Sequence, residues 1–147
     1  MPRYAASRTL LAPVEDVWAF VAEPYNLADW WPGVGGVQPD RRGFAPGARW
    51  EVQGTSFRAM QAPIGLSMFR RPGLTGTLVV TDILPGRRFA FQFTRDRVDV
   101  ELELEDAAQG RTRATVAVEA PWSAVPRSIA RDALRRLYDL VQTSADR

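Results

Sequence analysis

The sequence predicts an α+β fold in which a curved antiparallel sheet of six or seven strands wraps on a long C-terminal helix, with two short helices after the first strand. Two observations carry this prediction. Four segments between residues 74 and 120 alternate apolar and polar side chains and are joined by turn sequences, which is typical of antiparallel hairpins. Residues 123–145 repeat apolar side chains at helical spacing. A chain of 147 residues fits one domain, 1–147.

The N-terminal elements follow from proline positions and apolar spacing. Residues 3–11 predict the first strand, and residues 13–23 predict a helix whose first position suits Pro13. Residues 24–31 predict a second short helix between two prolines. This helix ends in the adjacent tryptophans Trp30 and Trp31. We expect one of them to pack where the short helices meet the sheet and the other to border a cavity. The alternative is that both are ordinary core or surface packing residues.

The remaining strands are separated by Gly- and Pro-containing turns. The passage from Pro32 to Gly47 predicts a short strand and a turn, and residues 57–73 give no clear assignment. Five further strands are predicted at residues 48–54, 74–84, 87–94, 97–106 and 111–120. In the C-terminal helix, predicted over 123–145, Ser123 is the expected cap.

Alternation along the strands assigns side chains to two faces of the sheet. Phe89, Phe91 and Phe93 share one face and are expected to lie opposite the long helix. An acidic row, Asp99, Glu101, Glu103 and Glu105, lies on the face opposite to Val98, Val100, Leu102 and Leu104. The row is interpreted as a solvated outer face paired with Arg111 and Arg113. A cation site is the alternative interpretation.

The composition excludes several kinds of chemistry. The chain has no Cys and no His, so a thiolate nucleophile, disulfides and the commonest metal ligand are missing. All 19 basic residues are Arg, which leaves no internal amine for Schiff-base chemistry. No phosphate-binding glycine motif occurs, and the arginines alternate with acids instead of clustering. We therefore expect no metal, no cofactor and no nucleic-acid partner.

Several stretches resemble the START-like, or SRPBCC, superfamily of polyketide cyclase/dehydrase and lipid-transport type. They are "APVEDVWAFVAEPYNLADWWPGV" after the first strand, "GARWEV" in the third strand, "VTDILPGRRFAFQF" in mid-chain and the closing amphipathic helix. The resemblance covers nearly the whole chain and implies the helix-grip fold. It also implies a hydrophobic small-molecule ligand, lipid-, polyketide- or aromatic-like, in a cavity between the sheet and the C-terminal helix. No catalytic motif is carried over from the superfamily.

The expected ligand-binding residues are apolar and aromatic side chains of the inner sheet face, the long helix and the segments between them. They are Trp30, Trp31, Trp50, Phe57, Met60, Met68, Phe69, Phe89, Phe91, Phe93, Val100, Leu102, Leu134 and Tyr138. The apolar stretch 60–69, "MQAPIGLSMF", has two interpretations. It is a bent edge strand over the core, or a lid over the cavity mouth whose flanking Arg58, Arg70 and Arg71 meet an acidic ligand group or a membrane.

Two alternatives to a ligand carrier remain open. One is a cyclase/dehydratase without metal or nucleotide cofactor, which would need Tyr25, Asp29, Glu51, Asp82 or Tyr138 inside the cavity with a shifted pKa. The other is an interaction module with an apolar surface near residues 60–69. In each case we expect a cytoplasmic monomer or weak homodimer that makes at most transient contact with a membrane.

Overall fold

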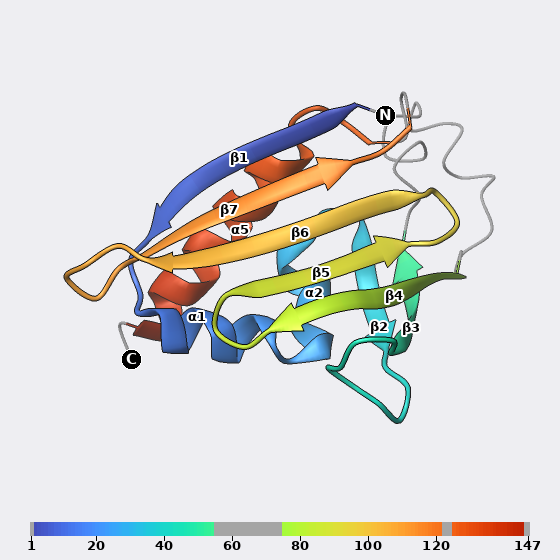
Figure 1. Cartoon of the computed structure of the whole chain (residues 1–147), viewed down its shortest axis with the longest axis horizontal. Coiled ribbons are helices and arrows are strands. Elements are labelled where there is room, and N and C mark those ends of the chain that lie inside the picture. Colours follow the sequence, from blue (N-terminus) through green and yellow to red (C-terminus); the bar gives the residue numbers. More distant parts are fainter. Residues whose placement is uncertain (1, 55–74, 122–124, 146–147) are drawn as a thin grey trace.

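The computed structural model describes residues 2–54, 75–121 and 125–145. The chain begins with β1 (Arg3–Leu10), α1 (Val14–Val21), the 3-10 turn η1 (Pro24–Asn26) and α2 (Leu27–Trp30). Six strands follow, and α5 closes the chain (Figure 1). The strands are β2 (Val34–Gln38), β3 (Arg49–Gly54), β4 (Thr75–Leu84), β5 (Arg88–Phe93), β6 (Val98–Asp106) and β7 (Thr112–Glu119), and α5 spans Ile129–Ala145.

The strands form one antiparallel sheet in the order β1-β7-β6-β5-β4-β3-β2. Figure 1 shows the helices on one side of this curved sheet, which we call the inner face. The helix α5 packs against β1 and β7, and α2 packs against β2 and touches α5. The predicted fold class is confirmed. No helix within the described ranges is long and apolar enough to cross a membrane.

The two short helices explain how adjacent tryptophans are both buried. Trp30 is the last residue of α2, whereas Trp31 is extended, with φ −96° and ψ 122°. Pro32 follows directly and disfavours helical dihedrals at the residue before it. The helix therefore ends between the two tryptophans, and their side chains leave the backbone in directions that a continuous helix would not allow. Both side chains are 0% exposed.

The start of the C-terminal helix was predicted too early. The helix begins at Ile129, after a turn in which the Ile129 N–H donates to the carbonyl of Pro126. Ser128, the residue before the helix, forms a 3.0 Å hydrogen bond from its hydroxyl to Asp132 Oδ2. Because Pro126 disfavours a helical conformation at the residue before it, the helix begins beyond that proline. The predicted cap, Ser123, lies outside the described residues.

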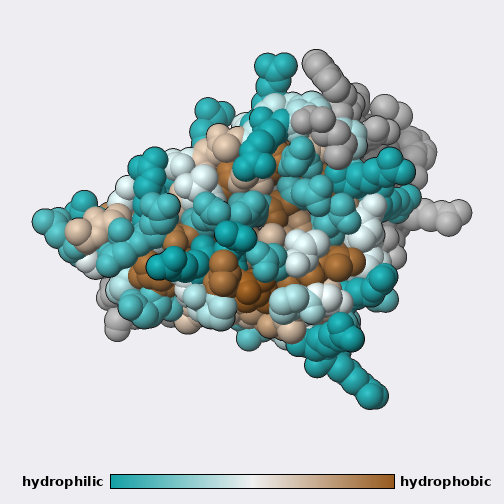
Figure 2. Space-filling view, in the orientation of Figure 1, coloured by the Kyte–Doolittle hydropathy of each residue, from teal (hydrophilic) through white to brown (hydrophobic). Residues whose placement is uncertain are grey.

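The outer face of the sheet carries the acidic row, but its observed ion pairs are made by Arg88 and not by the predicted partners, Arg111 and Arg113. Arg113 lies opposite Glu105 in the register, whereas Arg88 on β5 makes the observed ion pairs. Its guanidinium lies 3.0 Å from Asp82, 3.3 Å from Glu101 and 3.7 Å from Glu103. Figure 2 shows hydrophilic side chains over much of this face, with hydrophobic side chains between them in its lower middle. The described part of the chain contains no group of acidic side chains that could hold a metal ion.

Candidate functional site

An aromatic cluster fills the inner face between α2 and strands β3 to β5. Its members come from α1, α2, the loop after β2, and two strands: Trp18, Trp30, Trp31, Phe44, Trp50, Phe89, Phe91 and Phe93. Alternation along β5 turns its three phenylalanines inward, and all three are buried. We refer to these eight side chains as the aromatic cluster.

Phe91 is the centre of the aromatic cluster. Its ring centroid lies 5.8 Å from that of Trp31 and 6.3 Å from that of Trp30, in edge-to-face geometry. Along β5 it lies 4.9 Å from Phe89 and 5.5 Å from Phe93. Contacts of this kind contribute roughly 0.5–1.5 kcal/mol per pair beyond the area they bury. Phe91 thus couples α2 to the middle of the sheet.

Phe91 and Phe93 face the end of α2, contrary to our expectation that the phenylalanine row would face the long helix. Phe89 instead contacts Phe44 and Trp50. The ring contacts of Phe91 and Phe93 beyond β5 are made with the tryptophans at the end of α2. The long helix lies instead over β1 and β7, at the edge of the sheet. Because β5 is the fourth strand from that edge, the short helix α2 covers it.

Other predicted ligand-binding residues extend from the aromatic cluster toward α5. Val100, Leu102 and Leu134 are buried in the same core. Tyr138 packs against this core but is only partly buried, and the guanidinium of Arg8 lies 4.2 Å from its ring centroid. Four predicted residues, Phe57, Met60, Met68 and Phe69, lie outside the described residues, as do the whole of the proposed lid 60–69 and its flanking arginines.

The indole N–H groups of the aromatic cluster differ in whether they have a hydrogen-bond acceptor. Trp50 Nε1 donates to the carbonyl of Gly43 at 2.7 Å. Trp30 Nε1 and Trp31 Nε1 are both buried, and no described residue accepts a hydrogen bond from either. Buried polar groups in folded proteins are nearly always paired, so two unpaired donors in adjacent residues are a chemical feature of this inner face.

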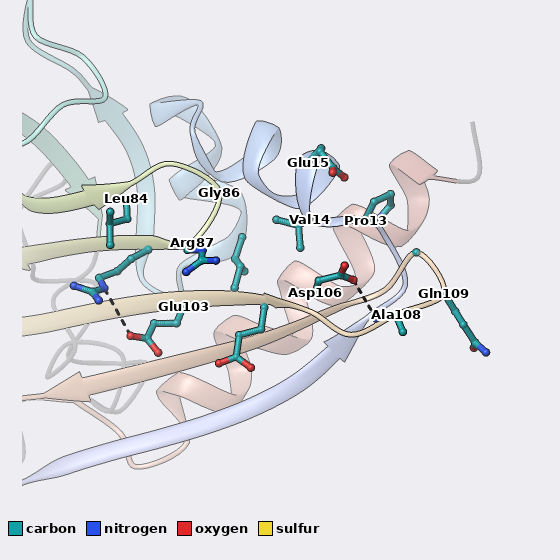
Figure 3. A pocket seen from close by; sticks show the side chains of 14 residues that line it. Pro13, Val14, Glu15, Leu84, Gly86, Arg87, Glu103, Asp106, Ala108 and Gln109 are labelled. Carbon is teal, nitrogen blue, oxygen red and sulfur yellow. Dashed lines mark hydrogen bonds and ion pairs between the residues drawn. The ribbon is translucent and has the colours of Figure 1, made fainter.

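A pocket of about 790 Å³ lies beside the N-terminal end of α1 (Figure 3). It is bounded by the start of α1, the β4–β5 turn and the β6–β7 hairpin, and it contains none of the predicted ligand-binding residues. The pocket arises because β6 extends beyond β5, whose first residue, Arg88, is the partner of Glu103. Its lining combines Pro13, Val14, Leu84, Gly86, Leu104, Ala108 and Gly110 with Glu15, Arg87, Arg88, Glu103, Glu105, Asp106 and Gln109.

The residues considered for catalysis lie away from the aromatic cluster. Tyr25, Asp29 and Glu51 are exposed, and Asp82 is on the outer face, paired with Arg88. Desolvation raises the pKa of Glu101, which is also on the outer face, and so does the hydrogen bond that its protonated carboxyl donates to the neighbouring Glu103. Backbone N–H groups, that of Arg49 above all, lower the pKa of Asp40 in the exposed loop after β2. Neither shifted carboxyl therefore serves the inner face.

These features define a helix-grip protein, with an antiparallel sheet, two short helices after its first strand and a long closing helix on the inner face. The family model described as "Polyketide cyclase / dehydrase and lipid transport" matches residues 1–144, so the chain belongs to that family and to the START-like, or SRPBCC, superfamily. Among curated proteins, none matches the chain significantly.

Solved structures show the same fold at low sequence identity. XoxI from Bacillus cereus is similar over 99% of both chains, with 12% identity and a TM-score of 0.70. An AHSA1-like protein from Aeromonas hydrophila is similar over 98% of this chain and 94% of its own, with 17% identity and a TM-score of 0.70. DR_A0006 from Deinococcus radiodurans covers 97% of this chain and 99% of its own, with 18% identity and a TM-score of 0.65.

Proposed function

We propose that this protein binds a hydrophobic small molecule, lipid-, polyketide- or aromatic-like, between the sheet and the C-terminal helix. The aromatic cluster is the observation that carries the proposal, because it joins rings from α1, α2, the loop after β2 and strands β3 and β5 into one apolar core. Val100, Leu102 and Leu134 continue this core toward the C-terminal helix. Membership of a family named for cyclisation, dehydration and lipid transport supports a ligand-binding role.

The placement of charge favours binding over catalysis. Of the described residues, the one buried polar or charged residue is Thr112, and its hydroxyl is already bonded to the carbonyl of Ala12 at 2.7 Å. A cyclase or dehydratase needs a positioned acid or base at its apolar site. Four of the five candidates, Tyr25, Asp29, Glu51 and Asp82, are exposed or lie on the outer face, and Tyr138 is partly covered by Arg8.

The test is binding of N-phenyl-1-naphthylamine, an apolar fluorescent probe excited by energy transfer from tryptophan. We expect saturable binding that Phe91→Leu weakens roughly three- to tenfold, because the variant loses aromatic contacts at the centre of the cluster. Leu84→Ala is the matched control, since Leu84 is 44% exposed and lines the separate pocket. If Leu84→Ala abolishes probe binding and Phe91→Leu leaves it intact, the binding site lies in that pocket and not at the aromatic cluster.

A second experiment identifies the natural ligand. Native mass spectrometry of protein purified from its own host should show a co-purified small molecule that is displaced by the probe. The same spectra report whether the protein is a monomer or a weak homodimer. A bound molecule that is strongly charged and lacks an apolar body would contradict the proposal.

A further inference from the structure

Trp30 and Trp31 present two buried hydrogen-bond donors for which no described residue is an acceptor. Both side chains are 0% exposed, and both Nε1 atoms lack a partner within the described residues. The indole N–H can only donate, so no rearrangement of its proton can satisfy it. Trp50 shows that this fold supplies a backbone acceptor to a buried indole elsewhere, through Gly43. Among the buried indoles of the described residues, those of Trp30 and Trp31 lack such an acceptor.

The packing holds these donors in place. The two indole rings lie 5.8 Å apart at an interplanar angle of 86°, and both make edge-to-face contacts with Phe91. Trp31 also stacks on Phe93 at 6.1 Å. A side chain fixed on several sides cannot turn its N–H toward solvent, so a partner must come to the donor.

We propose that the bound molecule carries a carbonyl-type oxygen that accepts a hydrogen bond from Trp30 Nε1, Trp31 Nε1 or both. This inference rests on the proposed function and narrows its ligand class to oxygenated aromatic or polycyclic molecules. A purely hydrocarbon ligand would leave both donors unsatisfied in an apolar surrounding, which is unfavourable.

The acceptor is a neutral oxygen and not a carboxylate. No charged residue within the described ranges is buried, and the single buried polar side chain, Thr112, is engaged by Ala12. A buried carboxylate needs a paired cation or several strong donors to offset its lost hydration. Two indole N–H groups suit a ketone, quinone or amide oxygen, which accepts two hydrogen bonds and carries no net charge.

The experiment compares fluorene with fluorenone, which share one tricyclic skeleton and differ by a carbonyl oxygen. We expect fluorenone to bind roughly tenfold more tightly, as one good hydrogen bond to an otherwise unpaired donor would give. Trp30→Phe and Trp31→Phe keep the aromatic packing and remove one donor each. At least one of these two variants should bring the ratio of the affinities for fluorenone and fluorene close to one. Tyr25→Phe is the matched control, because it also removes one donor from an aromatic side chain, but at a residue that is 57% exposed and lies outside the aromatic cluster.

A spectroscopic measurement on the unmodified protein keeps the test independent of the variants. In ¹⁵N-labelled protein, the side-chain N–H signals of Trp30 or Trp31 should move downfield on adding fluorenone and not on adding fluorene. The signal of Trp50 should stay in place, since Gly43 already accepts its hydrogen bond.

The possible failures are distinguishable. If the two compounds bind equally and neither signal moves, the proposed hydrogen-bond acceptor on the ligand is wrong, whereas the proposed binding of a hydrophobic molecule is not contradicted. Signals of Trp30 and Trp31 that resemble that of Trp50 before any ligand is added also overturn it, because another acceptor then satisfies both donors. Failure of both compounds and of the naphthylamine probe to bind overturns the proposed function itself.

Discussion

Thr112 should be the polar residue whose loss destabilises the described fold most. It stands at the start of β7 with its side chain fully buried, and its hydroxyl donates to the carbonyl of Ala12 at 2.7 Å. This bond ties the last strand to the connection between β1 and α1, and Ala12 is itself only 1% exposed. The change Thr112→Val keeps the shape of the side chain and removes the donor.

The expected loss follows from the burial of the acceptor. With the hydroxyl removed, the Ala12 carbonyl stays in the core without this donor, and leaving a buried group unsatisfied costs about 1–3 kcal/mol. For a domain of this size, each kcal/mol lowers the melting temperature by roughly 2–4 °C. The total free energy of unfolding is expected to be about 5–15 kcal/mol, so the variant should still fold.

Thr115→Val is the matched control on the same strand. The Thr115 hydroxyl also bonds across to β1, to Ser7 Oγ at 2.8 Å, but on the exposed outer face. Water can replace that bond, so we expect a change within about 0.5 kcal/mol. Urea unfolding followed by circular dichroism measures both variants. Equal losses for Thr112→Val and Thr115→Val would refute the argument from burial.

Three further predictions concern the sheet edge and the two shifted carboxyls. Gly54→Ala places a methyl group against the carbonyl oxygen of Gly33 and should cost about 1–3 kcal/mol, whereas Gly76→Ala meets open space and should be neutral by the same urea titration. Because the pKa of Asp40 is lowered, its carboxylate stabilises the fold at pH values above about 3.9, the ordinary value for Asp. This stabilisation is lost as the pH falls through the folded-state pKa. Asp40→Asn should therefore be less stable than the unmodified protein at neutral pH, and its stability should fall less in acid. The raised pKa of Glu101 acts in the opposite direction, because the folded protein gains stability as the pH falls through the folded-state pKa of Glu101 toward about 4.3. Glu101→Gln should therefore be more stable than the unmodified protein at neutral pH, and it should lack this gain in stability in acid. Unfolding measured from about pH 3 to 8 checks both signs.

Local patterns were sufficient for the fold because each element carries its own signal. The period-two rows of β5 and β6 fixed which side chains turn inward, and the structure buries Phe89 and Leu102 accordingly. The start of α5 could also have been read locally, since a proline disfavours a helical conformation at the residue before it and Ser128 offers a later cap. The same rule at Pro32 explains the extended Trp31.

The arrangement of the candidate site depended on contacts between elements far apart in the sequence. Nothing local to β5 indicates that Phe91 and Phe93 meet the end of α2 instead of the long helix, because that follows from the strand order. Likewise, the pocket near Leu84 comes from a difference in length between β5 and β6, and the pairing of Arg88 with Asp82 is set by the register beside a bulge in β4. Whether the fourteen expected ligand-binding residues contact a ligand stays a prediction.

The division of polar groups between the two faces would limit how the proposed site selects a ligand. Within the described residues, charges lie on the outer face and at the rims, and the inner face offers rings, aliphatic side chains and very few polar atoms. Apolar burial alone discriminates weakly between molecules of similar size, since one methylene changes affinity only by about 10–200-fold. A site that provides fixed donors rejects analogues lacking the matching acceptor more strongly, because its donors are then left unpaired. We propose that the indole N–H groups of Trp30 and Trp31, for which no described residue is an acceptor, make that distinction.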